Sequence, residues 1–342
     1  MISDDIKAFV KLGEFLQDDS SEVYKTIVDE ANQSNGWFTP ENIKNALQAL
    51  SKNLTEKKIN QWLKKYKSSI EQKKSSYTVG VIMAGNLPLV GFHDFMSVLL
   101  SGNKFLGKLS SQDNKLLPAL SKILIEFEPS FSERIIFEES FLKNFDAIIA
   151  TGSTNSSRYF EYYFSKYPHI IRKSRNSVAV LTGNETPNDL KELGKDIFQY
   201  FGLGCRNISK IFVPEGYDLT QLLDAFKSYK EIEYHYKYYN NYEYNKAVYL
   251  INNIKHLDNG FLLLKEQNEI ASPVGVVYYE QYKKIEDAIQ SIELHKENIQ
   301  CVVTDKKIFK HAVPFGCSQS PELHDYADGI DTMEFLLNIE KK

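Results

Sequence analysis

The sequence predicts an α/β protein built on mostly parallel sheets and preceded by a helical segment. Two observations predict this class. From Tyr77 onward, short apolar runs alternate with stretches of helical periodicity, which is the order of β-α-β units. Before Tyr77, apolar residues recur at helical spacing without strand-like runs. The 342 residues are enough for two or three domains with sizeable cores.

The composition excludes several classes of protein. The chain is 42% hydrophobic and 25% charged, as in ordinary globular proteins. A net charge of −4 gives no reason to expect nucleic acid as the main partner. The most apolar stretch, Val79–Leu100, contains Asn86, Pro88, His93 and Asp94, which argues against a membrane span. An acidic start and three scattered cysteines favour a cytoplasmic protein.

Residues 1–76 form the predicted helical segment, which we expect to pack on the main body, with a separate helical interaction module as the alternative. Thr39 and Pro40 mark one helix start, because threonine is a favoured N-cap and proline fits the first helical turn. The first α/β set follows this segment. It comprises helices Gly91–Ser101 and Lys115–Glu128 and strands Thr78–Ala84, Lys104–Lys108, Arg134–Phe137, Ala147–Ala150 and Ser177–Leu181.

A second α/β set occupies the rest of the chain. Its expected elements are helices Asp189–Phe201 and Leu219–Lys227 and strands Ser209–Val213, Lys246–Ile251, Val274–Tyr279 and Cys301–Thr304. The stretch from Tyr229 to Tyr249 carries eight tyrosines. We interpret it as a low-complexity surface insert, with the lining of a tunnel as the alternative.

The two sets predict two domains after the helical segment. The first is expected over residues 77–182 and the second over residues 183–305. No internal repeat is visible.

Two turns of the first set carry candidate ligand-binding side chains, since α/β proteins bind ligands at the carboxyl ends of strands. Asn86, within Gly85-Asn86-Leu87-Pro88, offers an amide donor to a carbonyl oxygen that gains negative charge. Ordinary turn chemistry is the alternative. Lys108 ends a strand and is suited to ribose hydroxyls or a phosphate, unless it is only a solvated lysine.

A third turn, Thr151-Gly152-Ser153, follows another strand and precedes a helix. Free N–H groups and the helix dipole favour an anion there. The alternative is that Ser153 serves only as an N-cap. Neither GxGxxG nor GxxxxGK[ST] is present, so both common phosphate-binding fingerprints are missing.

Cys205 is the candidate nucleophile, within Gly202-Leu203-Gly204-Cys205-Arg206. The glycines allow a close approach of substrate, and Arg206 favours the thiolate. A small buried hydrophobic residue is an equally supported interpretation. Cys301 is expected in the core and Cys317 in a turn. No histidine or cysteine spacing suggests a metal site, and no GxSxG elbow suggests a serine hydrolase.

In order, these segments resemble the aldehyde dehydrogenase superfamily, and specifically its LuxC-type acyl-CoA reductase branch. The likeness spans about residues 77 to 320 and includes two later segments. The matching segments are Asn86-Leu87-Pro88, Gly102-Asn103 with Lys108, Thr151-Gly152-Ser153, Gly204-Cys205, Glu269-Ile270-Ala271-Ser272-Pro273-Val274 and Pro314-Phe315-Gly316. The resemblance implies an aldehyde dehydrogenase-like fold. It has a Rossmann-type nucleotide-binding domain, expected over residues 77–182 and completed by residues 306–342, and an α/β catalytic domain, expected over residues 183–305.

The resemblance also implies roles for these residues. Cys205 is implied as the nucleophile and Asn86 as the oxyanion donor. A nicotinamide cofactor, NADPH with NADH as the alternative, would be held by Lys108, Thr151, Gly152, Ser153 and Glu269. The implied substrate is an acyl-CoA or acyl-carrier thioester, and a homo-oligomer is compatible with the family.

One departure from the family pattern indicates the direction of the chemistry. Oxidising members carry a glutamate that activates water, whereas Arg172-Lys173-Ser174-Arg175 stand in that region here. Without that base, water is a poor acceptor, so reduction of the thioester to an aldehyde is predicted. Asp189 or Glu192 as a substitute base stays open. The basic cluster is interpreted either as a site for cofactor or coenzyme A phosphates or as a solvated turn.

Three other functions stay open. They are an oxidative aldehyde dehydrogenase, an acyl-phosphate reductase on the same fold, and a non-catalytic cofactor-binding protein.

Overall fold

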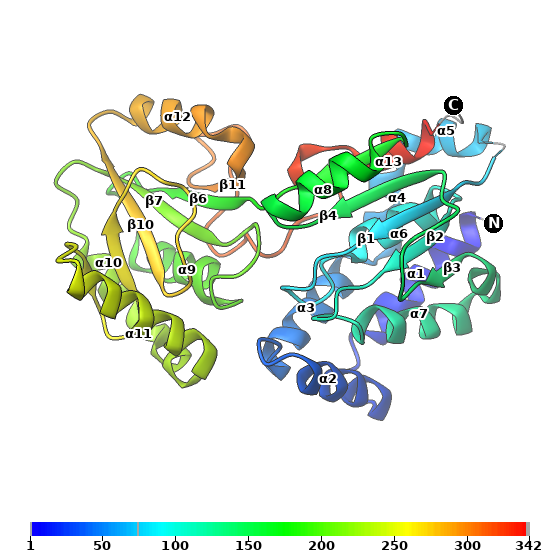
Figure 1. Cartoon of the computed structure of the whole chain (residues 1–342), viewed down its shortest axis with the longest axis horizontal. Coiled ribbons are helices and arrows are strands. Elements are labelled where there is room, and N and C mark those ends of the chain that lie inside the picture. The colour runs from blue at the N-terminus through cyan, green and yellow to red at the C-terminus, as the bar shows by residue number, and fades with distance from the viewer. Residues whose placement is uncertain (1, 74, 340–342) are drawn as a thin grey trace. The chain divides into compact units, whose positions relative to one another are not determined.

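The computed structural model of the protein describes residues 2–73 and 75–339. The chain divides into two compact units, Met1–Ser174 with Glu322–Lys342 and Arg175–Pro321. We name them unit 1 and unit 2. Each unit is built on a β-sheet of its own (Figure 1).

Unit 1 begins with helices whose starts are capped by hydroxyl side chains. Ser21, Thr39 and Thr55 each accept a hydrogen bond from the backbone N–H three residues on. Pro40 occupies the first helical turn after Thr39, so this predicted helix start is confirmed. The helices are α1 (Ile2–Phe15), α2 (Glu22–Ser34), α3 (Pro40–Asn53), α4 (Glu56–Leu63), η1 (Lys64–Tyr66) and α5 (Lys67–Gln72).

The sheet of unit 1 is parallel, with strand order β3-β2-β1-β4-β5. The strands are β1 (Thr78–Ile82), β2 (Lys104–Lys108), β3 (Ile135–Phe137), β4 (Ala147–Thr151) and β5 (His169–Arg172). The other elements are α6 (Phe92–Leu100), α7 (Leu116–Phe127), η2 (Pro129–Glu133), α8 (Thr154–Phe164), η5 (Ala327–Gly329) and α13 (Thr332–Leu337). The order reverses between β1 and β4, and such a switch point is where doubly wound sheets bind ligands.

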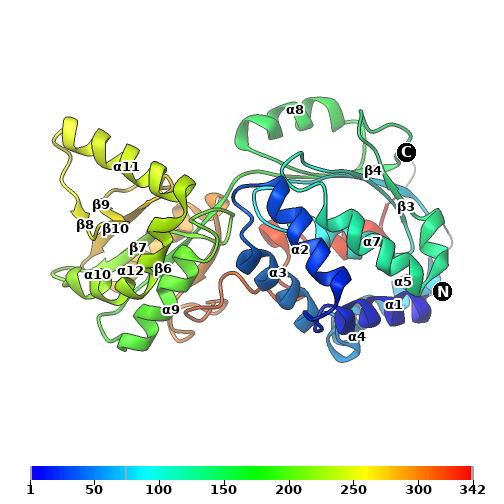
Figure 2. The ribbon, with the colours of Figure 1, turned by 90° about the horizontal axis from the view of Figure 1, so that it is seen from below.

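The N-terminal helices share the main core of unit 1. Figure 2 shows α8 on one face of the sheet and α7, with α1 and α2, on the other. Phe9 of α1 is fully buried, and its ring lies 6.3 Å from Phe92, 6.3 Å from Phe95 and 5.9 Å from Phe131 between centroids. A buried ion pair joins Asp5 to Arg134 at 2.8 Å. The helical segment is therefore part of unit 1.

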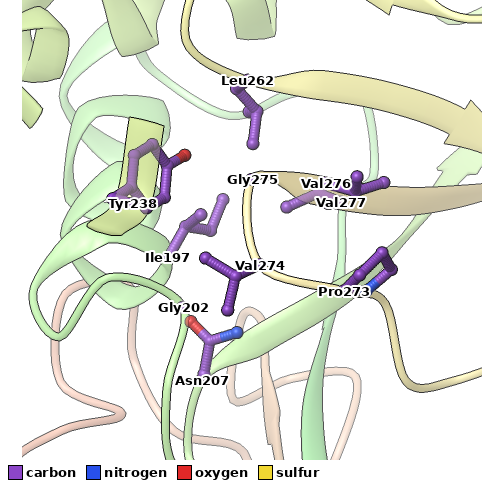
Figure 3. A pocket seen from close by; sticks show the side chains of 10 residues that line it. All are labelled: Ile197, Gly202, Asn207, Tyr238, Leu262, Pro273, Val274, Gly275, Val276 and Val277. Atoms are coloured by element: carbon purple, nitrogen blue, oxygen red, sulfur yellow. The ribbon is translucent and has the colours of Figure 1, made fainter. Parts of the chain in front are cut away.

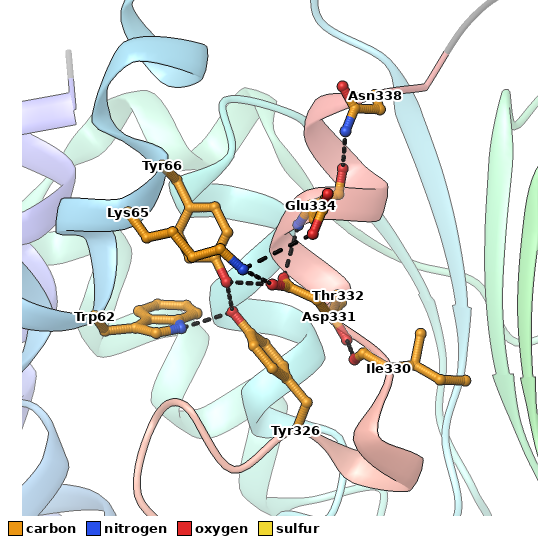
Figure 4. A network of polar contacts seen from close by, with 9 residues as sticks. All are labelled: Trp62, Lys65, Tyr66, Tyr326, Ile330, Asp331, Thr332, Glu334 and Asn338. Carbon is orange, nitrogen blue, oxygen red and sulfur yellow. Dashed lines mark hydrogen bonds and ion pairs between the residues drawn. The ribbon is translucent and has the colours of Figure 1, made fainter.

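A polar network ties the N-terminal helices to the C-terminal residues (Figure 4). Trp62 Nε1 donates to the Tyr326 hydroxyl at 2.8 Å, and the Tyr66 hydroxyl lies 2.8 Å from the same oxygen. The Tyr66 hydroxyl also donates to Asp331 at 2.7 Å, and Lys65 pairs with that carboxylate at 2.8 Å. These contacts hold the chain after Glu322 on unit 1.

The sheet of unit 2 has the order β11-β6-β7-β10-β9-β8 and is parallel except for the β8–β9 pair. In Figure 1 helix α12 lies on one face, and α9, α10 and α11 lie on the other. The elements are β6 (Asn176–Val180), α9 (Pro187–Phe198), β7 (Ile208–Pro214), α10 (Thr220–Phe226), η3 (Lys227–Tyr234), α11 (Tyr236–Ile251), β8 (Leu257–Asp258), β9 (Leu263–Glu266), β10 (Val276–Tyr282), α12 (Ile285–Leu294), η4 (Lys296–Asn298) and β11 (Ile299–Val303).

The predicted α/β class with N-terminal helices is confirmed. The expected strand at Lys246–Ile251 is wrong, because these residues end helix α11. The surface-insert interpretation of the tyrosine-rich stretch is also wrong in part. Tyr238, Tyr242 and Tyr249 are buried at helical spacing, and the Tyr238 hydroxyl donates to the Phe261 carbonyl at 3.0 Å.

The observed division differs from the expected boundaries at two places. Strand β6, which we expected within residues 77–182, pairs with β7 and β11 in the sheet of unit 2. Residues 306–321, expected to complete the nucleotide-binding domain, belong to unit 2. Strand pairing is non-local, so spacing along the chain could not reveal it. No helix among the described residues is both long and apolar enough to cross a membrane.

Phe9→Ala is expected to lower the free energy of unfolding by about 3–5 kcal/mol, because it opens a cavity among packed aromatic rings. Urea unfolding followed by circular dichroism measures the change. Val23→Ala on α2 is the control, because Val23 is 54% exposed and its truncation should cost less than about 0.5 kcal/mol. A loss below 1 kcal/mol for Phe9→Ala, on the order of a surface change, would contradict the shared core.

Candidate active site

Asn86 is exposed in the turn between β1 and α6. Gly85 is required there, because a Cβ would come within 2.6 Å of the Ser110 Cβ and 2.9 Å of the Asp113 backbone N. Asp113 accepts a hydrogen bond at 2.8 Å from the backbone N–H of Leu89, which has a φ of 61°. Burial raises the pKa of Asp113 to about 6. A buried carboxyl group thus holds the turn that presents Asn86.

Lys108 ends β2, the neighbour of β1. Its Nζ donates to the Ser140 carbonyl at 2.7 Å and lies 5.2 Å from the centroid of the Phe141 ring. Phe141 is 80% exposed. These contacts give the ammonium group a defined position at the carboxyl edge of the sheet. The interpretation as a solvated lysine predicted no such contacts.

Thr151 ends β4, and Gly152 and Ser153 lead into α8. Ser153 accepts a hydrogen bond from the Ser156 N–H at 3.1 Å, so its use as an N-cap is confirmed. Gly152 packs against α8, because a Cβ there would come within 2.9 Å of the Ser156 Cβ and 2.8 Å of the Phe160 ring. Asn86, Lys108 and this helix start lie at the carboxyl ends of three adjacent strands.

The basic cluster after β5 is largely structural. Arg172 is buried; it pairs with Asp94 at 2.6 Å and donates to the Thr332 hydroxyl at 2.9 Å. Both expectations for Arg172, a phosphate ligand and a solvated turn, are therefore wrong. Arg175 donates to the Ile299 carbonyl at 3.3 Å. Lys173 is exposed.

Cys205 is exposed in the turn between α9 and β7. The interpretation as a buried hydrophobic residue is therefore wrong. Gly202 and Gly204 have φ values of 78° and 91°, which glycine adopts without strain. The Ser177 hydroxyl of β6 donates to the Cys205 carbonyl at 3.0 Å. The thiol thus lies on a turn whose backbone is fixed from the neighbouring strand.

The other two thiols lie in different surroundings from each other. The Cys301 sulfur lies 3.1 Å from the same Ser177 hydroxyl, and burial raises the pKa of the Cys301 thiol. Cys317 is exposed in a turn, as expected. Among the described residues, no group of three His, Cys, Asp or Glu side chains is arranged to hold a metal ion.

The turn containing Pro314-Phe315-Gly316 is held by Asp196 of α9. Its carboxylate accepts hydrogen bonds from the Gly316 N–H at 2.7 Å and the Ser318 N–H at 2.9 Å. Burial raises the pKa of Asp196 to about 6. The Glu192 carboxylate lies where a side chain on Gly316 would extend.

The two candidate substitute bases have different surroundings. Asp189 caps its own helix, accepting from the Thr186 N–H at 2.9 Å and hydroxyl at 2.7 Å. It is therefore committed to a structural contact. Glu192 lies beside Gly316 and stays open as a base.

Glu269 is exposed in the loop between β9 and β10. Burial, aided by the Glu269 charge, raises the pKa values of Tyr249 and Tyr278, which places these rings near its carboxylate. Cys205 and Glu269 belong to unit 2, whereas Asn86, Lys108 and Thr151–Ser153 belong to unit 1.

A small pocket adjoins the Cys205 turn (Figure 3). Gly202 and Asn207 of that turn line it, but Cys205 does not. The remaining lining residues come from α9, α11 and the chain around β9 and β10: Ile197, Tyr238, Leu262, Pro273, Val274, Gly275, Val276 and Val277.

Sequence reasoning missed the buried polar residues that hold these loops. Ser177 and Lys210 stand in apolar strand runs, whereas Asp196 lies within helix α9 and Asp113 lies in the polar loop before α7. A polar residue inside an apolar run is the signal that could have found Ser177 and Lys210.

A parallel sheet in unit 1 and a mostly parallel sheet in unit 2 match the aldehyde dehydrogenase-like fold, and solved structures agree. Aldehyde dehydrogenase 21 from Physcomitrella patens, in complex with the reaction product succinate, matches with a TM-score of 0.67 and 13% identity over 99% of this chain and 84% of that chain. An oxidoreductase from Marinobacter aquaeolei matches at 0.68 and 11%, over 94% and 79%. The NAD+ complex of aldehyde dehydrogenase from Bacillus cereus matches at 0.63 and 13%, over 92% and 75%.

A family comparison identifies the protein more specifically than its fold does. The model of the acyl-CoA reductase (LuxC) family matches residues 17–226, more than half of the chain. The protein belongs to the LuxC acyl-CoA reductase family, which confirms the resemblance inferred from its motifs. No curated protein matches the sequence.

Asp196→Asn is expected to flatten the pH dependence of the unfolding free energy between about pH 4 and 6. The pKa of Asp196 is raised from 3.8 to about 6, so the folded protein binds this proton more tightly. The stabilisation is complete below the unfolded pKa and is lost as pH rises through about 6, a change of about 3 kcal/mol.

Urea titrations at closely spaced pH values measure this slope. Asp224→Asn, at an exposed position on α10, is the control and should keep the wild-type slope. An unchanged slope in Asp196→Asn would show that this carboxyl group titrates normally.

Proposed function

We propose that this protein reduces an acyl thioester, from acyl-CoA or an acyl carrier, to an aldehyde with NADPH. The acyl group passes through a thioester on Cys205. The observation that carries the proposal is the exposed Cys205 thiol on a backbone-fixed glycine turn in a chain of the LuxC family.

In the first step the Cys205 thiolate attacks the thioester carbonyl carbon. A carbon–sulfur bond forms and the carbonyl electron pair moves to oxygen. The Asn86 amide and the Cys205 backbone N–H donate hydrogen bonds to this oxyanion. When the carbonyl re-forms, the carrier leaves as a thiolate and the acyl group stays on Cys205.

The residues of unit 1 fit a dinucleotide. The start of α8 offers backbone N–H groups at the switch point of the sheet. Lys108 adds a cation at the carboxyl end of β2. The cofactor would be held by Lys108, Thr151, Gly152, Ser153 and Glu269. Its reduced nicotinamide would supply the hydride.

The end of β2 favours NADPH over NADH. NAD-binding sheets place a carboxylate near the ribose 2′-hydroxyl, whereas Lys108 is followed here by Leu109, Ser110 and Ser111. The nearby Glu138 carboxylate already accepts hydrogen bonds from Ser140. Lys108 donates to the Ser140 carbonyl, and in this proposal the same ammonium group also pairs with a 2′-phosphate.

The proposed reduction is favoured over hydrolysis because two of the three positions considered for a water-activating base are committed to other contacts, which leaves Glu192 as the one to test. Arg172 is held by Asp94, and Asp189 caps its own helix. After hydride addition, the thiohemiacetal on Cys205 expels the thiolate and releases an aldehyde.

The test is a panel of acyl-CoA chain lengths with NADPH, followed by the absorbance of the reduced cofactor and by trapping of the aldehyde. No consumption with any thioester, with the thiols kept reduced, would overturn the proposal. Turnover of an acyl phosphate alone would support an acyl-phosphate reductase. Oxidation of an aldehyde without a thiol acceptor, abolished by Glu192→Gln, would support an oxidative enzyme.

Cys205→Ser is expected to lower NADPH consumption by about 10³-fold or more. Without NADPH, the wild type should gain the mass of one acyl group, which intact-protein mass spectrometry detects. Cys317→Ser is the matched control and should still gain this mass. An adduct that persists in Cys205→Ser would move the nucleophile to another residue.

Lys108→Ala is expected to raise the KM for NADPH by about tenfold and the KM for NADH much less, because a phosphate–ammonium pair is lost. Steady-state kinetics with each cofactor measures the difference. Lys104→Ala, at the exposed opposite end of β2, should change neither value. Equal effects on both cofactors would contradict a 2′-phosphate contact.

A further inference from the structure

Lys210 is fully buried on β7, near the centre of the sheet of unit 2. A buried ammonium group is costly unless it is paired and hydrogen-bonded. Lys210 has two partners. It forms an ion pair with Glu280 on the adjacent strand β10, and it donates to the Asn268 carbonyl at 2.8 Å.

Ser209, the residue before it, contacts the same loop. Its buried hydroxyl donates to the Ile270 carbonyl at 2.7 Å. The two carbonyl groups bonded by β7 therefore belong to the residues on either side of Glu269. The Glu269 side chain is left exposed between two anchored peptides.

A β-bulge allows this double contact. The pairing of β6 with β7 runs from Ser177–Ile208 to Val178–Lys210, so Ser209 is an extra residue on β7. Side chains of a regular strand alternate between faces, whereas a bulge re-aims one of them. Consecutive residues can therefore reach one loop.

We propose that Ser209 and Lys210 are positioning residues that fix Glu269 relative to the Cys205 turn. The turn leads directly into β7, so one strand carries the nucleophile at its start and the two anchors next to it. This inference rests on the proposed function, in which Glu269 holds the nicotinamide ribose.

The two half-reactions separate this role from general stability. Acyl transfer to Cys205 releases the carrier thiol without any cofactor, whereas reduction needs the cofactor in place. Loosening the Glu269 loop should impair only the second. A loss of packing around β7 should impair both, because Cys205 precedes the same strand.

Two variants test the anchors. Ser209→Ala removes one hydrogen bond. Lys210→Met with Glu280→Gln removes the buried pair together, so that no charge is left unpaired, and such replacements often preserve the fold. Ser121→Ala is the matched control, because Ser121 is a buried serine of α7 whose hydroxyl donates to the Leu117 carbonyl at 2.8 Å.

The expected result is a rise in the KM for NADPH of about threefold for Ser209→Ala and about tenfold for the double variant. Thiol release from acyl-CoA without NADPH should stay within about twofold of the wild type. Adding Glu269→Gln to the double variant should have little further effect, since both changes remove the same contact. Ser121→Ala should match the wild type in every assay.

Three outcomes would overturn the inference. The first is an unchanged KM for NADPH, and the second is a loss of thiol release as large as the loss of reduction. The third is that the effects of Glu269→Gln and of the double variant on the KM for NADPH multiply in full. Titration of NADPH binding by fluorescence tests the anchors without turnover. If the wild type binds NADPH but reduces no thioester, the proposed function fails. The anchors are then judged by this titration alone, in which weaker binding by both variants supports them and unchanged binding overturns them.

Discussion

The site segments of this protein depend on one constraint: turns at strand ends have backbone groups that no sheet or helix can pair. Buried backbone donors and acceptors must find partners, and here single buried side chains supply them. The Asp113 carboxylate accepts a hydrogen bond from a backbone N–H of the Asn86 turn, and the Ser177 hydroxyl donates one to the Cys205 carbonyl. The Asp196 carboxylate accepts hydrogen bonds from two N–H groups of the turn at Gly316. Lys210 does the same for a carbonyl beside Glu269. Each loop is thereby held in one conformation.

Burying these charged side chains lowers the stability of the fold. Burial raises the pKa values of Asp113 and Asp196 to about 6, so each ionised carboxylate opposes folding at neutral pH. The ammonium group of Lys210 is likewise disfavoured by burial, which lowers its pKa against the influence of Glu280. Apolar residues at these positions would leave the loops without partners. The positions are therefore better explained by the geometry of the loops than by the stability of the units.

The sequence predicted the features that depend on local periodicity. Strand Lys104–Lys108 and the cap at Thr39 have the expected bounds, because alternation and capping are local signals. Helix α11 was misread at Lys246–Ile251, since tyrosine is a strand former by propensity while its spacing here is helical. Pairing of β6 with the second sheet and the anchoring of loops by Ser177 are contacts between residues far apart in the chain. Periodicity carries no information about such contacts.

Two of the four side chains at residues 172–175 are committed to structural contacts. Arg172 neutralises the buried Asp94, and Arg175 binds a carbonyl at the start of β11. A glutamate in place of Arg172 would put two carboxylates together in the core of unit 1, at a cost of several kcal/mol. A glutamate in place of Arg175 would face a carbonyl group that needs a donor. Arg172 and Arg175 are thus committed to contacts within unit 1 and unit 2 respectively, so replacing either with glutamate would cost stability in that unit before the new carboxylate could act on a bound acyl group.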